Sequence, residues 1–257
     1  MASKKQKRRV RNIILVVLLI VLLLVADWLY FQWSSYQKAV HSRFPEFGII
    51  MPAEYSIHGI DVSRYQKYIV WDEVSEMEVL GIKLNFCFIK ATEGADRTDQ
   101  QFSRNWERSK KAGVIRGAYH FFNPNSSAKK QADNFISKVK LESGDLPPVL
   151  DIEHFSGGSI ERFRQEALHW LQQIEQHYGV RPIIYTNVSF YDRILGSQFD
   201  EYALWVAHYE QPTGPRIGRD WSFWQHNEKG HVNGIAQEVD FNVFKGDTVA
   251  FKKLLIP

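Results

Sequence analysis

From residue 57 onward the chain alternates short apolar segments with longer segments of helical periodicity, and this alternation limits its fold more than any other feature. Eight strand-like segments are expected, at residues 57–62, 84–91, 115–122, 148–153, 182–186, 203–208, 222–226 and 239–244. Helical patterns separate the first five, at 71–80, 100–112, 126–140 and 160–178. Repeated strand–helix–strand units build parallel sheets covered by helices. The pattern therefore predicts an α/β fold, a single TIM-barrel-like β/α barrel with helices mainly in its first half.

A doubly wound open sheet is the main alternative, because it produces the same alternation of strands and helices. Such sheets usually carry a glycine-rich turn after the first strand, where backbone N–H groups bind a phosphate. Here that turn reads Asp61-Val62-Ser63-Arg64-Tyr65-Gln66 and contains no glycine. The sequence therefore shows no nucleotide-binding loop, which favours the barrel.

The N-terminal segment differs in composition from the rest of the chain. Residues 1–12 carry six Lys and Arg and no acid, although the whole chain has 32 Lys and Arg against 29 Asp and Glu. Without this tail the remainder is slightly acidic, so the formal net charge of +3 does not indicate nucleic-acid binding. Residues 13–33 are almost wholly apolar and end in aromatic side chains, and about 20 such residues span a bilayer.

These features predict four segments. Residues 1–12 are a basic cytoplasmic tail, 13–33 a transmembrane signal anchor, 34–55 a juxtamembrane linker and 56–257 the barrel domain. Cations before an apolar span keep the N-terminus in the cytoplasm, so the barrel is expected on the outer side of the cell membrane. A cleaved signal peptide is the alternative, and the protein would then be secreted. Leu24-Val25-Ala26 is a poor cleavage site, which favours the anchor.

Carboxylates stand at several of the expected strand ends, where a β/α barrel carries its reactive groups. Asp61 ends the first strand, Asp151 and Glu153 end the fourth, and Asp240 lies on the eighth. Side chains two apart on a strand point to the same side, so Asp151 and Glu153 are expected to project into one cavity. Like charges this close leave a protonated acid beside an ionised base, which suits cleavage of a glycosidic bond. A solvated strand end whose acids cap neighbouring loops is the structural alternative.

Other catalytic classes have weaker support. The histidines are scattered and show no His-x-x-x-His spacing, although strand-end histidines could bind a metal together with Asp61 or Asp240. No Gly-x-Ser-x-Gly motif occurs, so a serine hydrolase is unsupported. The single cysteine, Cys87, excludes an internal disulfide and a cysteine-rich metal site.

Seven short motifs follow one another in the order of a known family. They are His58-Gly59-Ile60-Asp61-Val62-Ser63, Phe88-Ile89-Lys90-Ala91-Thr92-Glu93-Gly94, Gly117-Ala118-Tyr119-His120-Phe121, Leu150-Asp151-Ile152-Glu153, Leu204-Trp205-Val206-Ala207-His208-Tyr209, Trp224-Gln225 and Val239-Asp240-Phe241-Asn242. Each motif alone is weak, but the ordered set resembles the family 25 glycoside hydrolases, the Chalaropsis-type lysozymes. The resemblance covers residues 57–246.

The resemblance implies a flattened β/α barrel with N-acetylmuramidase activity, which cuts the β-1,4 bond between N-acetylmuramic acid and N-acetylglucosamine in peptidoglycan. By this resemblance Glu153 is the general acid/base and Asp151 orients the substrate's 2-acetamido group, in a substrate-assisted, retaining reaction. Asp61 and Asp240 would set the electrostatics of the cleft. The expected substrate-binding residues are Tyr119, Trp224, Gln225, Tyr185, His208 and Glu93.

No metal or organic cofactor is implied by the family. The expected partners are the glycan strands of peptidoglycan and, through the N-terminal helix, the lipid bilayer, with the protein itself a monomer. Two alternatives stay open at this point. One is a barrel that binds glycan without cutting it, and the other is a metal-dependent amidase or deacetylase acting on the cell wall.

Overall fold

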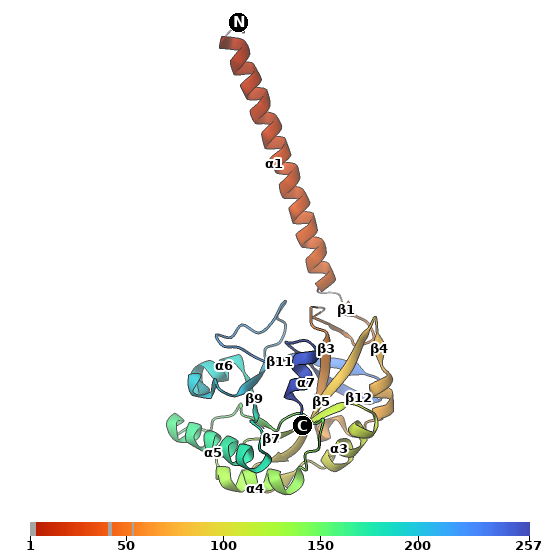
Figure 1. The fold of residues 1–257 in the computed structure, drawn as a ribbon, viewed down its shortest axis with the longest axis vertical. Coiled ribbons are helices and arrows are strands. Elements are labelled where there is room, and N and C mark those ends of the chain that lie inside the picture. Colours follow the sequence, from red (N-terminus) through yellow and green to blue (C-terminus); the bar gives the residue numbers. More distant parts are fainter. Residues whose placement is uncertain (1–3, 41–42, 53) are drawn as a thin grey trace. The chain divides into compact units, whose positions relative to one another are not determined.

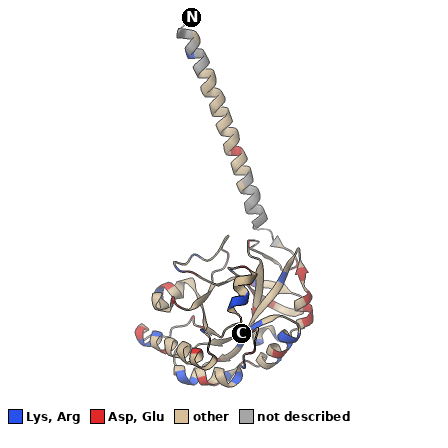
Figure 2. Ribbon diagram, in the orientation of Figure 1, with Lys and Arg blue, Asp and Glu red and all other residues tan. Residues whose placement is uncertain are grey.

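The computed structural model describes residues 4–40, 43–52 and 54–257, which divide into two compact units on either side of residue 42. The N-terminal unit is one helix, α1 (Lys4–Val40). Its stretch Asn12–Phe31 is long and apolar enough to cross a membrane, and none of it is buried within the structure. Asp27 is the single charged residue of this stretch, and Figure 2 shows the helix there mostly in the colour of uncharged residues. A helix of this kind at the N-terminus is a signal sequence or an anchor, and either makes the barrel extracytoplasmic.

The second unit contains a closed barrel of eight strands (Figure 1). They are β3 (Ile57–Val62), β5 (Ile82–Glu93), β7 (Ile115–Phe121), β8 (Val149–Asp151), β9 (Ile183–Asn187), β10 (Ala203–Ala207), β11 (Phe223–Val232) and β12 (Ile235–Phe244). Neighbours from β3 through β5 and on to β11 pair in parallel. The last strand, β12, pairs antiparallel with both β11 and β3 and so closes a mixed barrel. The predicted barrel is confirmed.

Helices connect the strands mainly in the first half, as the sequence predicts. They are α2 (Trp71–Glu76), α3 (Phe102–Lys111), α4 (Ala128–Lys138) and α5 (Ile160–Tyr178), followed by α6 (Val188–Phe190) and α7 (Thr248–Leu254). The chain also forms the turns η1 (Arg64–Gln66), η2 (Tyr191–Leu195) and η3 (Ser197–Phe199) and the two-residue strands β1 (Arg43–Phe44), β2 (Ile49–Ile50), β4 (Glu78–Val79) and β6 (Arg97–Thr98). Figure 2 shows charges of both signs on α3, α4 and α5, the solvated helices outside the barrel.

The side chains of the strands alternate between two cores. One face fills the barrel interior, where Phe88 stacks on Trp205 with 4.3 Å between ring centroids. The other face of the strands packs against the surrounding helices, and this outer core includes Trp170 of α5. Gly59 and Gly117 make room for the interior rings, because a Cβ at either position would lie within 2.6 Å of Phe86 or Phe88 atoms. Much of the aromatic content of the chain is therefore structural.

The segment before the barrel differs from its prediction. Residues 34–55 are expected to form a linker, but α1 continues to Val40 and the hairpin of β1 and β2 belongs to the barrel unit. Phe47 is fully buried, and its ring meets that of Phe241 on β12 edge-on, with 5.4 Å between the ring centroids. Apolar side chains at positions 44, 47, 49 and 51 supply the burial that holds the hairpin. The compact unit that contains the barrel therefore begins at Arg43.

Candidate active site

A cavity of about 270 Å³ opens at the carboxyl ends of the barrel strands, and every strand contributes a side chain to it. Taken one from each strand in chain order, residues of the lining are Asp61, Lys90, Tyr119, Asp151, Tyr185, Trp205, Gln225 and Asp240. Glu153 also lines the cavity, from the loop after β8. The structure thus brings all four predicted carboxylates to one cavity, together with Tyr119, Tyr185 and Gln225 from the expected substrate-binding set.

The position of Glu153 follows from how β8 ends. The strand stops at Asp151, two residues before the predicted end, yet the N–H of Ile152 still donates to the Tyr185 carbonyl oxygen at 2.9 Å. Ile152 packs into the outer core between strands and helices. The alternation of sides therefore continues for one more step, and Glu153 returns to the side of Asp151. The Asp-x-Glu spacing works as predicted, although Glu153 itself lies in a loop.

Two amides fix Asp61 opposite Asp240, its partner in the pairing of β3 with β12. Gln225 and Asn242 each donate an N–H to Asp61 Oδ2 at 2.8 Å. Neither side-chain amide can rotate by half a turn to present its oxygen to Asp61, because that oxygen already accepts hydrogen bonds from other side chains. Tyr185 and Tyr209 donate to Gln225 Oε1 at 2.8 Å each, and the Trp205 indole donates to Asn242 Oδ1 at 2.7 Å. Aromatic residues of the barrel thus orient Asp61 through the two amides.

Burial raises the pKa of every carboxyl group in this cavity. The pKa of Asp151 is raised well above its ordinary value by burial first and by repulsion from Glu153 second, with Lys90 opposing. The pKa of Glu153 is raised by burial, with His154 and Lys90 opposing. Burial, reinforced by the Asp61 charge, also raises the pKa of Asp240. A site that holds protonated carboxyl groups near neutral pH can supply a general acid.

Lys90 is the cation inside this group of acids. Its ammonium donates to Glu93 Oε2 at 2.8 Å and lies 4.4 Å from the ring centroid of Phe121. Glu93 also pairs with Arg97 at 2.6 Å. Burial acts to raise the pKa of Glu93, but the bonds and charges of Lys90 and Arg97 prevail and lower it. Glu93, expected to bind substrate, therefore stays ionised and positions Lys90 from outside the cavity lining.

A second, wider groove of about 660 Å³ adjoins the cavity and shares Glu153, Tyr185 and Tyr209 with it. Its other wall comes from the segment after β9 and from His208, so His208 lies in this groove, outside the central cavity. Burial lowers the pKa of His208, and the nearby Arg216 lowers it further. The cavity and the groove therefore meet at Glu153, and their walls form one continuous surface around it.

Trp224 is placed differently from its prediction. Its side chain is 1% exposed and does not line the cavity, and its indole donates to the His208 carbonyl oxygen at 2.8 Å. The alternation along β11 explains this, since Gln225 faces the interior and its neighbour must face outward. Trp224 therefore supports the turn that carries His208 and Tyr209, from a position outside the cavity lining.

Among the residues missed by the sequence prediction are Lys90, Trp205, Tyr209 and Asn242. All four stand in the motifs that carry the family resemblance, close to residues that the prediction selects. A signal for Asn242 exists in the pairing, because Gln225 and Asn242 stand opposite each other on β11 and β12. Among the residues that the structure describes, no three His, Cys, Asp or Glu side chains come together as ligands of one metal ion.

Comparisons with known proteins agree with this geometry. The family model described as glycosyl hydrolases family 25 matches residues 60–235, which is more than half of the chain. The chain belongs to glycosyl hydrolase family 25. Membership implies a peptidoglycan substrate and a lysozyme-like glycosidase.

Both curated relatives and solved structures of this family resemble the chain. The uncharacterized protein YegX of Escherichia coli K12 is 48% identical over 78% of this chain and 74% of its own length. Lysozyme M1 of Streptomyces globisporus is 38% identical over 79% of this chain and 72% of its own length. A family 25 glycosyl hydrolase from Bacillus anthracis has 32% identity and a TM-score of 0.72, covering 79% of this chain and 95% of that structure. The bacterial lysozyme of Streptomyces coelicolor has 35% identity and a TM-score of 0.69, covering 77% and 96%.

Proposed function

We propose that this protein is an N-acetylmuramidase, a lysozyme that hydrolyses the β-1,4 bond between N-acetylmuramic acid and N-acetylglucosamine. The observation that carries the proposal is the pair Asp151 and Glu153, which line one cavity and both have raised pKa values. Most glycosidases use a pair of carboxyl groups at one sugar-sized cavity, on either side of the bond that is cut. Family membership supports the same substrate.

Glu153 is the general acid/base of the proposed reaction. It stands where the central cavity meets the adjoining groove, so a glycan strand lying across both would place its scissile oxygen beside this carboxyl group. Its raised pKa keeps a proton available for the leaving sugar oxygen. After departure of that sugar, the ionised Glu153 takes a proton from the attacking water.

Asp151 acts on the substrate's 2-acetamido group. Its Oδ1 is buried and has no hydrogen-bond partner in the structure, so it offers a free acceptor to an acetamido N–H. That bond would direct the acetamido oxygen to the anomeric carbon as the internal nucleophile of a retaining reaction. Asp61, whose two amide hydrogen bonds favour its ionised form, supplies negative charge that stabilises the cationic transition state, while Asp240, Tyr119 and Tyr185 form the cavity wall.

The N-terminal helix is proposed to be an uncleaved anchor with its basic end in the cytoplasm. Lys and Arg before the span, and aromatic side chains at its far end, are the arrangement of a signal anchor. The barrel would then act as a monomer on peptidoglycan close to the outer side of the cell membrane. We further propose the segments 1–12, 13–33 and 56–257 as tail, anchor and catalytic domain, the last extended to Arg43.

The test is product analysis with the full chain in detergent on defined peptidoglycan. We expect mass spectrometry to find new reducing ends on N-acetylmuramic acid, and Glu153→Gln to lower the rate by about 100-fold or more. Glu161→Gln, which changes an exposed acid on α5, is the matched control and keeps full activity.

Each alternative function has its own result in this experiment. Unchanged activity in Glu153→Gln would refute the role of Glu153 as the acid. Saturable binding of glycan with no product would favour the binding barrel. Release of peptides or acetate, with loss of activity after metal removal, would favour the amidase or deacetylase.

A further inference from the structure

The groove beside the central cavity has a charge pattern that the proposed hydrolysis does not use. It shares Glu153, Tyr185 and Tyr209 with the cavity, so a polymer bound at Glu153 continues into it. Its outer wall is formed by the segment after β9 and includes the exposed pair Asp192 and Arg193. A side group on the sugar next to the scissile bond would meet this wall.

Three basic side chains line the groove and the central cavity, and Arg193 is the one available to a ligand. Lys90 is held by Glu93 at 2.8 Å. His208 is uncharged near neutral pH, because burial and the nearby Arg216 lower its pKa. Arg193 forms no ion pair with any residue that the structure describes, although Asp192 is its neighbour in sequence.

The backbone around Arg193 holds its side chain toward the groove. Arg193 lies in η2, a single π-helical turn, a form that occurs often at functional sites. Its Nε donates to the Ser189 carbonyl oxygen at 3.2 Å, which fixes the stem of the guanidinium. The two terminal nitrogens keep their donors for a ligand, and a guanidinium binds a carboxylate with paired hydrogen bonds.

We propose that Arg193 binds a carboxylate carried by the muramyl residue of the substrate. This inference rests on the proposed muramidase function. Muramic acid bears a lactyl ether whose carboxyl group is either free or extended by an acidic stem peptide, so both forms present the same chemistry. In a lining rich in acids, such a substrate needs a cation at the place where its side group lies. Arg193 supplies that cation, and Asp192 opposes it.

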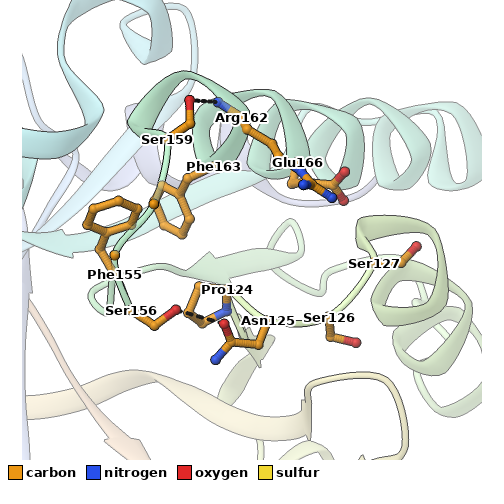
Figure 3. A pocket seen from close by; sticks show the side chains of 12 residues that line it. Pro124, Asn125, Ser126, Ser127, Phe155, Ser156, Ser159, Arg162, Phe163 and Glu166 are labelled. Carbon is orange, nitrogen blue, oxygen red and sulfur yellow. Dashed lines mark hydrogen bonds between the residues drawn. The ribbon is translucent and has the colours of Figure 1, made fainter.

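The structure offers a matched control in a separate hollow of about 400 Å³, shown in Figure 3. Arg162 lines this hollow, between the loop after β7 and the start of α5, and is exposed like Arg193. The hollow shares no lining residue with the groove or the cavity. Arg162→Gln therefore makes the same change of charge outside the proposed path of the glycan.

The experiment measures kcat/KM of the full chain on three glycan substrates. One carries stem peptides, one has been stripped of them to leave free lactyl carboxylates, and one has been stripped and then amidated so that it is neutral. We expect Arg193→Gln to lower kcat/KM about tenfold on at least one carboxylate-bearing substrate, mainly through KM, and to leave the neutral one unchanged. Arg193→Lys should restore part of the loss, Asp192→Asn should lower KM, and Arg162→Gln should have no effect.

The pattern across the substrates decides the inference. A loss only with stem-bearing strands assigns Arg193 to the peptide, and a loss only with stripped strands assigns it to the lactyl carboxylate. No loss on either, or an equal loss on the neutral substrate, overturns the role. Absence of product from all three with the unaltered protein would refute the muramidase function, and the inference with it.

Discussion

Asp61 and Asp151 are buried in the same cavity, yet their surroundings stabilise the two ionised carboxylates to different extents. Asp61 accepts two amide N–H bonds, which favour its ionised form and offset part of the effect of burial on its pKa. Asp151 Oδ1 has no hydrogen-bond partner among the described residues, and Glu153 adds repulsion to the effect of burial. Ionised Asp151 therefore lowers the stability of the folded protein. A hydrogen bond from the substrate's N–H would recover this loss.

We predict that Asp151→Asn stabilises the protein while it lowers activity. The pKa of Asp151 is higher in the folded than in the unfolded chain, so its contribution to stability is fully present below the unfolded pKa. That contribution is lost as pH rises through the folded pKa, whereas asparagine does not titrate. The free energy of unfolding should therefore exceed that of the unaltered protein by about 1 kcal/mol at pH 8 and by much less at pH 4.

Urea unfolding at both pH values measures this difference. Glu161→Gln, at its exposed position on α5, controls for the loss of one carboxylate. A stability difference that shrinks as pH rises would contradict a raised pKa of Asp151 in the folded protein.

The hairpin of β1 and β2 shows how an element outside the barrel becomes part of its core. Its two strands pair over two residues each, which provides little stability by itself. The burial of Phe47 and Ile49 against the barrel unit supplies the rest. Ile50, the next residue on β2, points outward and is 48% exposed. The hairpin is therefore a one-sided element held by its inner face.

We predict that Ile49→Ala destabilises the protein by about 2–5 kcal/mol, because it removes buried methyl groups and leaves a cavity. Ile50→Ala removes the same atoms from an exposed position and should change stability by less than about 0.5 kcal/mol. Chemical denaturation of the two variants makes the comparison. Equal effects would show that the hairpin does not pack against the core.

At the scale of the whole molecule, the charges of the chain divide between its two units. The basic residues of the tail adjoin an apolar helix, while the four acids of the cavity lie in a domain whose outer helices carry both signs (Figure 2). The excess of cations therefore lies at the N-terminal helix, and the cavity is lined by acids. This division supports the proposed enzyme, which would be attached at one end and act beyond the membrane.

We predict that the protein stays in the membrane fraction with its N-terminal residues intact. A phosphatase joined after Pro257 should be active outside the cytoplasm, and replacing the six cations of residues 1–12 by asparagine should reduce that activity. Mass spectrometry of the isolated protein should find peptides from residues 1–26. A mature chain that begins after Ala26 would show a cleaved signal peptide in place of the anchor.

The sequence by itself determines the order of elements, the barrel and the carboxylates of its site. Hydrophobic periodicity reports which face of a strand is buried, and Asp61, Asp151 and Asp240 stand on or at the end of strands where that periodicity is clear. It predicts the approximate place of every barrel strand and the bounds of α5, whose limits are marked by Ser159 and by Gly179 with its positive φ. Local chemistry of this kind needs no distant partner.

The tertiary structure decides what depends on partners far apart in the chain. Gln225 and Asn242 meet Asp61 across more than 160 positions, so no local pattern assigns them their role. Trp224 turns away from the cavity because its neighbour Gln225 faces inward, a choice that the register of β11 makes. The hairpin before the barrel is a linker by its composition and an element only through its contacts. A sequence records which side chains are available, whereas the closure of the barrel decides which of them meet.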